Sequence, residues 1–221
     1  MNPQAKRLRR LVVNVEGRRV DIGIPGSERW EAIESVEGNP VENLAPTLRT
    51  LLDRSGLHPG DFDAWIYSGG PGSLLGLRSL AMLLATWEVS LRPKTVAQFR
   101  FSGMVWAARD IQRKHPGEPF SLISPWRTNA WNVLTVSNLP AEEKNLQVSE
   151  GSLHTDLGKC YFLRGERMRS NPPPEATSVQ LPSFETLIHH LDSPGFLTET
   201  AKVEPILSGT TQYKKWIPRA G

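Results

Sequence analysis

The sequence predicts an α/β fold of two subdomains, each with a mixed sheet flanked by helices. Short strand-like runs alternate with amphipathic helical runs over roughly the first hundred residues, which is typical of a layered α/β domain. The chain has 221 residues, of which 38% are hydrophobic and 22% charged, enough to bury a core without disulfides. We expect a first subdomain over residues 1–97 and a more irregular second subdomain over residues 98–221.

The first subdomain begins with a predicted three-stranded meander. A helix follows, with Asn39 as its N-cap, Pro40 at the first helical position and Glu42 three residues after the cap. Gly56 is the expected end of this helix. The three expected strands are Leu11–Val15, Arg19–Ile24 and Trp30–Ser35.

A fourth strand is expected at Ala64–Ser68, followed by a glycine-rich turn over residues 69–73 and a helix over Leu75–Leu91. Three antiparallel strands, a helix, a crossover strand and a second helix form the first half of an actin-like, ribonuclease-H-type domain. The predicted architecture is therefore the actin-like ASKHA fold.

The second subdomain gives weaker signals. We expect a helix over Gln98–His115, closed by a Pro-Gly pair, and a short helix over Phe184–Leu191. Ser170–Pro174 contains three consecutive prolines and predicts a stiff loop. The expected strands are Phe120–Ser124, Trp131–Val136 and Cys160–Leu163.

Composition excludes several classes of protein. The formal net charge of +3 is too small to indicate a nucleic-acid-binding protein, and the basic cluster over residues 6–10 is most simply a solvated tail. One cysteine, Cys160, excludes an intramolecular disulfide and is consistent with a reducing compartment. With no signal-peptide-like run and no stretch of about 20 apolar residues, we expect a cytoplasmic protein that does not engage membranes.

The segment Asp61–Arg78 carries the most specific motif, a strand that ends in a Gly-Pro-Gly-Ser turn followed by a Gly-Leu-Arg helix start. This motif resembles the signature of the TsaB family. The matching residues are Gly70, Pro71, Gly72, Ser73, Gly76, Leu77 and Arg78.

The resemblance implies a function. TsaB-type proteins are non-catalytic partner subunits that support a TsaD-like transferase in making threonylcarbamoyladenosine (t6A), a tRNA modification. It implies a heterodimer with a TsaD-like protein, a TsaE-like ATPase as a further partner, a homodimer when the chain is alone, and only indirect contact with tRNA. No cofactor is expected.

The helix after the turn has no charge over Ser79–Trp87 and is apolar on nearly every face, so it must be covered on more than one side. Either the two halves of the chain cover it or a partner does. In TsaB-like proteins this helix and the preceding one pack against the equivalent helix pair of a related subunit. The residues expected at such an interface are Leu44, Leu48, Leu51, Leu77, Leu80, Leu84 and Trp87.

The glycine-rich turn permits a tight strand-to-helix connection with positive φ, and free N–H groups at the helix start can bind an anion. The turn lacks the Gly-Lys-Ser/Thr ending of a Walker A loop. Both a sharp structural turn and an anion or nucleotide loop stay open. The loop would consist of Gly70, Gly72, Ser73, Gly76 and Arg78.

Two departures from the family bear on catalysis. Where actin-like proteins place an Asp after the first strand, this chain reads Asn14-Val15-Glu16-Gly17, and an Asn is a poorer magnesium ligand than a carboxylate. Where TsaB relatives show Asp-Ala-Arg-Arg, it reads Ser124-Pro125-Trp126-Arg127. His189 and His190 are adjacent and cannot face one ion from a helix. We therefore expect no metal site, no catalytic residues and no enzyme.

Three alternatives stay open. The first is an ATPase or phosphotransferase that uses the cleft between the subdomains, in which substitution of Asn14 or Glu16 abolishes turnover. The second is an RNA-binding module built on the basic N-terminus and the Trp126–Trp131 region. A protease ranks last, because the sequence shows neither metal ligands nor a nucleophile.

Overall fold

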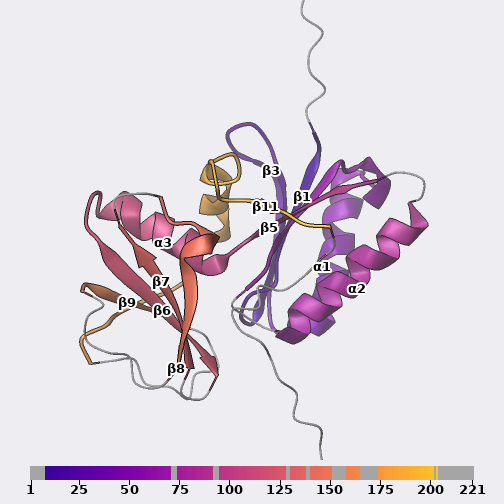
Figure 1. Cartoon of the computed structure of the whole chain (residues 1–221). Helices are drawn as coiled ribbons and strands as arrows, with labels where there is room; N and C mark the ends of the chain where they lie inside the picture. Colours follow the sequence, from indigo (N-terminus) through magenta and orange to yellow (C-terminus); the bar gives the residue numbers. More distant parts are fainter. Residues whose placement is uncertain are drawn as a thin grey trace, which may run out of the picture.

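A computed structural model describes residues 8–70, 74–91, 95–127, 130–137, 140–150, 158–164, 174–201 and 203. Two sheets stand side by side, with a helix between them and two further helices on the outer face of the first sheet (Figure 1).

The first sheet is mixed and has the strand order β11-β5-β4-β1-β2-β3. β1, β2 and β3 are antiparallel, whereas β1, β4 and β5 are parallel. The meander, the crossover and the fourth strand are therefore confirmed. The strands are β1 (Arg10–Asn14), β2 (Arg19–Pro25), β3 (Trp30–Glu37), β4 (Ala64–Ser68), β5 (Ala97–Phe101) and β11 (Thr198–Glu199).

Two helices, α1 (Pro40–Ser55) and α2 (Leu74–Ser90), cover one face of this sheet (Figure 1). The predicted caps of α1 are confirmed. The Asn39 side chain accepts a hydrogen bond from the Val41 N–H, and Gly56 ends the helix with a left-handed φ of 63°.

The helix predicted over Gln98–His115 is wrong in its first part, because residues 97–101 form β5 and the helix α3 (Gly103–Lys114) starts after it. β5 pairs with β4 in parallel and with β11 antiparallel, and these partners outweigh the local helical pattern. Ser102 then caps α3 by accepting from the Val105 N–H. The boundary predicted between residues 97 and 98 falls inside this strand.

The second sheet has the order β10-β9-β6-β7-β8 and is also mixed. Three of its strands match the predicted ones, and β8 and β10 were not predicted. The strands are β6 (Phe120–Arg127), β7 (Ala130–Val136), β8 (Leu146–Glu150), β9 (Cys160–Leu163) and β10 (Thr177–Val179).

Short 3-10 helices complete the elements. They are η1 (Pro59–Asp61), η2 (Glu143–Asn145) and η3 (Phe184–His189). The last of these is the short helix predicted over Phe184–Leu191. The predicted loop Ser170–Pro174 lies outside the described residues except for Pro174.

The C-terminal segment returns to the first sheet. Phe184 stacks on Trp30 with ring centroids 4.8 Å apart, and the Trp30 indole N–H donates to the Glu185 carbonyl. Further along, β11 adds to the edge of β5. These contacts tie a segment from the end of the chain to the hairpin near its start.

The core consists chiefly of two clusters that share the strands of the first sheet. One face of β1 and β4 packs on α1 and α2. The opposite face, with Val12 and Ile66, packs on α3, which also contacts Leu122 and Leu134 of the second sheet. α3 therefore joins both sheets into one hydrophobic interior. None of the described helices is both long and apolar enough to cross a membrane.

The helix pair generates a test of stability. Leu80 is fully buried under α2, whereas Met82 on the same helix is 72% exposed. We expect Leu80→Ala to lower the free energy of unfolding by about 2–5 kcal/mol, because it removes buried methyl groups and leaves a cavity. Met82→Ala is the matched control. It should change the free energy of unfolding, measured by urea unfolding, by less than about 0.5 kcal/mol. Equal losses in both variants would contradict this packing.

Candidate functional site

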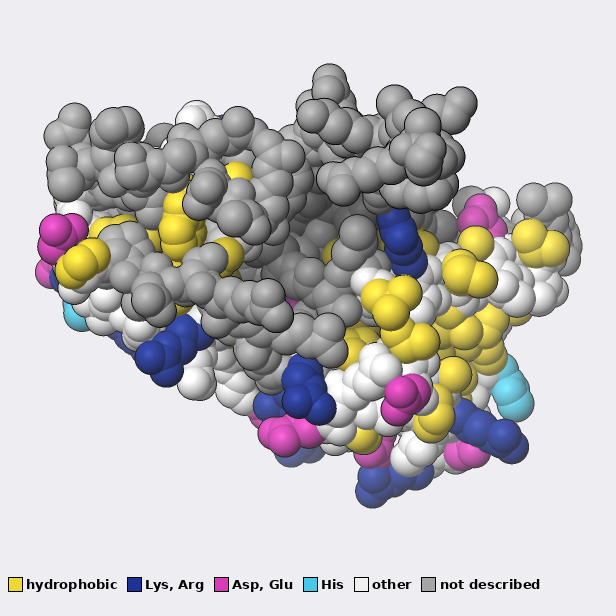
Figure 2. Space-filling model, turned by 90° about the horizontal axis from the view of Figure 1, so that it is seen from below, with side chains coloured by type: hydrophobic (Ala, Val, Ile, Leu, Met, Phe, Trp, Pro, Cys, Tyr) yellow, Lys and Arg dark blue, Asp and Glu magenta, His cyan; other side chains and the backbone are white. Residues whose placement is uncertain are grey.

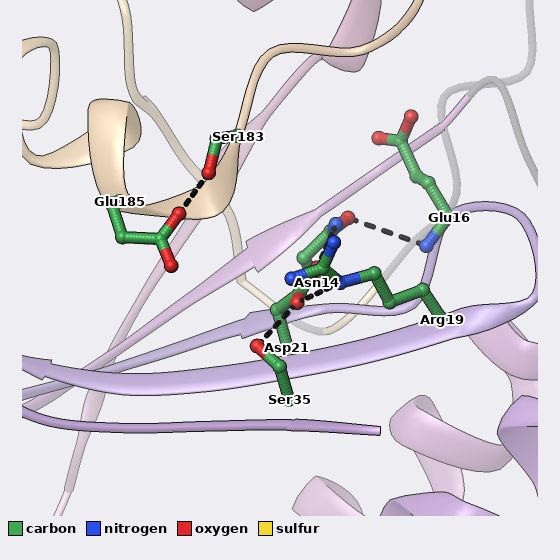
Figure 3. Close-up of polar contacts among 7 residues, drawn as sticks. All are labelled: Asn14, Glu16, Arg19, Asp21, Ser35, Ser183 and Glu185. Carbon is green, nitrogen blue, oxygen red and sulfur yellow. Dashed lines mark hydrogen bonds and ion pairs between the residues drawn. The ribbon is translucent and has the colours of Figure 1, made fainter. Parts of the chain in front are cut away.

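β1 ends at Asn14, the point at which actin-like proteins are expected to carry an Asp. Asn14 stands at this point and is buried. Its side-chain Nδ2 donates to Asp21 Oδ2 at 3.1 Å, and its Oδ1 accepts from the Glu16 N–H at 3.3 Å (Figure 3). Asn14 therefore stabilises the β1–β2 hairpin through both ends of its amide.

Asp21 completes this network. One carboxylate oxygen accepts from Arg19 Nε at 2.6 Å and from the Ser35 hydroxyl at 2.7 Å, and the other accepts from Asn14 (Figure 3). A buried carboxylate needs such partners, because burial without them disfavours the charge. The network uses Asn14 and Asp21 to hold neighbouring strands together.

Across from the hairpin, the Ser183 hydroxyl donates to the carboxylate of Glu185 (Figure 3). This hydrogen bond is the main cause that lowers the pKa of Glu185, and the charge of Arg19 adds a smaller lowering. Arg19 thus interacts with a carboxylate on each side, Asp21 within the hairpin and Glu185 on η3.

Glu16 behaves differently from its neighbours. Its side chain points away from Asp21 (Figure 3), and only 3% of the residue is exposed. Neither carboxyl oxygen has a hydrogen-bond partner. Burial raises the pKa of Glu16 to about 8, and the nearby backbone N–H groups of Gly103 and Gly70 lower it only in part.

The position of Glu16 is defined by two glycines. Gly103 is the first residue of α3, and a Cβ on it would lie 2.1 Å from Glu16 Oε2. Gly70 has a φ of 104° and accepts a hydrogen bond from the Gly103 N–H at 3.1 Å. The carboxyl group therefore lies directly on the joint between the turn after β4 and the start of α3.

The predicted anion loop is only partly described. Gly70 forms a turn with positive φ, as expected. Gly76 is buried within α2, and Arg78 is exposed on the same helix. Gly72 and Ser73 lie outside the described residues. The binding of an anion or nucleotide by this turn stays a prediction.

Residues 124–127, where the resemblance to TsaB proteins predicted an acidic turn, form the end of β6. Ser124 is buried, where its hydroxyl lies 3.3 Å from Met104 Sδ and accepts from Asn132 Nδ2 at 3.2 Å. Ser124 therefore connects β6 to α3 and β7. The side chains of Trp126 and Arg127 are not described, and Trp131 packs against Phe162. Within the described part of the chain, no three His, Cys, Asp or Glu side chains group as a metal site would require.

The residues expected at a partner interface lie on the inner side of the helix pair. All six leucines are at most 4% exposed and pack in the core under α1 and α2. Trp87 is half-buried, with its ring centroid 6.0 Å from that of Trp65. These side chains hold the helices on their own sheet, and the six leucines present almost no surface to a partner. The six leucines are Leu44, Leu48, Leu51, Leu77, Leu80 and Leu84.

A different set of apolar side chains faces outward from α2. Leu75, Met82 and Val89 are 59%, 72% and 62% exposed. They are spaced by seven residues, about two helical turns, and so form one stripe along the helix. Figure 2 shows hydrophobic side chains gathered on the side of the molecule that carries α1 and α2. Val41 of α1 is also exposed.

Hydroxyl groups on α2 are satisfied by the helix itself. Ser79, Thr86 and Ser90 each donate to the carbonyl oxygen four residues earlier, at distances of 3.1, 2.8 and 2.9 Å. Hydroxyls that already have an acceptor cost less to remove from water. Covering the outer face of α2 with a partner therefore costs less desolvation free energy than its serine and threonine content suggests.

The sequence contained a signal for this stripe that the interpretation above missed. The uncharged run from Ser79 to Trp87 predicted cover on two sides, but the interface was assigned to the residues with the strongest core periodicity. The seven-residue spacing of Leu75, Met82 and Val89 would have identified the outer stripe. No comparable signal exists for Glu16, because Gly103 approaches it only in the folded chain.

Comparison with known proteins supports the fold. No protein-family model matches the sequence, and no curated protein matches it either. Among solved structures, YeaZ from Pseudomonas aeruginosa matches with a TM-score of 0.59 at 16% identity, covering 91% of this chain and 100% of that one. A second, described as an uncharacterized protein with similarity to peptidase YEAZ from Pseudomonas aeruginosa, gives 0.59 at 18% identity, covering 92% and 100%. The chain therefore has the actin-like fold of YeaZ, and the predicted fold class is confirmed.

The burial of Glu16 predicts a pH dependence. An unfolded glutamate titrates near 4.5 and the folded one near 8, so between these values the folded protein holds one proton more than the unfolded chain. The free energy of unfolding should fall as the pH rises from 5 to 8, by up to about 1.4 kcal/mol per unit. Glu16→Gln should remove this slope in urea unfolding. Parallel profiles for the two proteins would contradict the assignment.

An acidic residue in place of Asn14 should destabilise this chain. In Asn14→Asp, the donor to Asp21 is replaced by a second carboxylate at hydrogen-bonding distance, inside the core. We expect a loss of about 3 kcal/mol or more at pH 7, and a smaller loss at pH 5, where protonation of one carboxyl restores a donor. Thermal unfolding at both values of pH measures this difference. An Asn14→Asp variant as stable as the wild type would show that the network contributes little.

Proposed function

We propose that this chain is a non-catalytic partner subunit of the TsaB type, which docks a TsaD-like transferase on the outer face of α1 and α2. In this role it supports the synthesis of threonylcarbamoyladenosine in tRNA and contributes no catalytic group of its own. The observation that carries the proposal is the apolar stripe of Leu75, Met82 and Val89 on α2.

The chemistry of the stripe supports docking of a protein. Between Arg78 and Glu88 the helix carries no charge, so the centre of the stripe around Met82 can be covered without burying an ion, while the exposed Arg78 lies beside Leu75 and Met82 on the same face. Its hydroxyls are satisfied internally, and exposed apolar patches of this kind mark interaction sites. The inner leucines fix the helix on its sheet, which presents the stripe in one rigid orientation.

The fold supports the choice of family. The chain folds like YeaZ over nearly its whole length, and the Gly-Pro-Gly-Ser segment resembles the TsaB signature. The engagement of Asn14 with Asp21 is consistent with a chain that has no need of a magnesium ligand at this point.

The proposal includes the assembly. The TsaD-like protein presents its equivalent helix pair to α1 and α2, a TsaE-like ATPase joins the complex, and two copies of the chain use the same face when no partner is present. tRNA contacts the complex through the transferase. Such a role places the chain in the cytoplasm.

A binding experiment tests the proposal. Met82→Glu places a charge in the centre of the stripe, and Leu8→Glu places one on another exposed apolar residue, 62% exposed, that precedes β1 and is not part of the stripe. We expect Met82→Glu to weaken binding of the TsaD-like protein from the same organism at least tenfold, about 1.4 kcal/mol. Leu8→Glu should bind like the wild type in isothermal titration calorimetry.

The choice of position matters, because Leu84 is buried and a charge there would report on folding. t6A formation in a reconstituted reaction should follow the affinities. A folded wild-type chain that binds no TsaD-like protein would refute the proposal, and magnesium-dependent ATP binding by that chain would favour the nucleotide-hydrolysing alternative.

A further inference from the structure

Glu16 has no part in the proposed docking surface, yet its carboxyl group lies where three segments of the chain meet. Three segments meet at its carboxyl group, namely the turn between β1 and β2, the turn at Gly69–Gly70 and the first turn of α3. The group is almost fully buried, and neither oxygen has a hydrogen-bond partner. An unpartnered buried carboxyl group calls for an explanation, since buried polar atoms normally find partners.

The contact with α3 is direct. Only a glycine at position 103 leaves room for the carboxyl group, because any Cβ there would overlap Glu16 Oε2. The Gly103 N–H is already bonded to the Gly70 carbonyl at 3.1 Å, so the helix start and the turn close on each other beneath the glutamate. The side chain therefore bridges the β1–β2 turn to both segments.

No charged side chain among the described residues balances Glu16. In the hairpin, Asp21 is occupied by Arg19, Ser35 and Asn14. On α3 the first ionisable residue is Arg109, which donates to the carbonyls of Ala141 and Pro194.

Two hydroxyl groups on the segments next to Glu16 accept hydrogen bonds from the backbone. The Ser68 hydroxyl at the end of β4 accepts from the Val15 N–H, and Ser102 caps α3 by accepting from the Val105 N–H. Gly69 and Gly70 have no side chains. Among the described residues, no charged side chain compensates an ionised Glu16, so its burial favours the neutral carboxyl group.

We propose that Glu16 is a proton-operated latch between the β1–β2 turn and α3. In its neutral form the carboxyl group packs on Gly103 and holds the turn against the helix. The ionised form is released to water, and the turn moves away from the start of α3. Opening separates the β1–β2 turn from the start of α3 locally, while the rest of the fold stays intact.

Burial sets the range of the switch, because it raises the pKa of the closed glutamate to about 8. In the open state the group is solvated and titrates near its ordinary value of 4.5. The equilibrium constant for opening should therefore rise about tenfold per pH unit between pH 5 and 8, and level off above pH 8. The open state is therefore more populated at neutral pH than in mild acid.

Hydrogen exchange of the whole protein, corrected for the intrinsic effect of pH, tests the latch. In the wild type we expect the amides of Val15, Glu16 and Val105 to open about a hundredfold more at pH 7 than at pH 5. Glu16→Gln keeps a neutral group of the same shape, so its opening should not change with pH. Equal pH profiles in the two proteins would overturn the proposal.

Two further readouts separate the latch from global unfolding. The Val133 amide of β7 pairs within the second sheet and should exchange with a much smaller opening constant than Val15 at every pH. Identical constants for both amides would mean that no local latch exists. Gly103→Ala should expel the carboxyl group and leave the turn open at all pH values. A Gly103→Ala variant with wild-type protection would overturn the contact itself.

Discussion

The packing of α3 between the two sheets is the constraint on which the rest of the structure depends. One face of the first sheet, through Val12 and Ile66, and one face of the second, through Leu122 and Leu134, both close on this helix. Because β1 and β4 are buried on both faces, they have to be continuously apolar, and polar groups at their ends must find partners locally. Asn14 donates to Asp21, whereas the carboxyl oxygens of Glu16 have no hydrogen-bond partner. The returning C-terminal segment fastens the arrangement through Phe184 and β11.

The same constraint separates two roles within the helix pair. α1 and α2 cover one face of the first sheet, and their buried leucines hold them there. What remains for function is the outward stripe of Leu75, Met82 and Val89. A helix that presents an apolar stripe with satisfied hydroxyls suits association with another protein better than chemistry on a small molecule.

Local patterns in the sequence predicted the first sheet and α1 well. The Asn39 cap, the Gly56 ending and the meander depend on neighbouring residues, and all three are confirmed. β5 could not be predicted in this way, because Gln98, Phe99 and Arg100 become a strand only through pairing with β4 and β11. β8 and β10 are likewise defined by the strands beside them. The burial of Glu16 depends on Gly103, which is 87 residues further along the chain (103 − 16). The seven-residue spacing of the outer stripe could have predicted it. The interface was instead predicted at the leucines whose spacing is typical of core residues.

The central claim is that the outer face of α2 is where a TsaD-like protein binds, and site-specific photo-crosslinking measures this most directly. A photoreactive amino acid at position 82 should crosslink to the helix pair of the TsaD-like protein. The same group at position 8, which is also exposed but is not part of the stripe, should give no crosslink. Crosslinking at position 8 and none at position 82 would contradict the account, because the partner would then bind a surface other than the stripe.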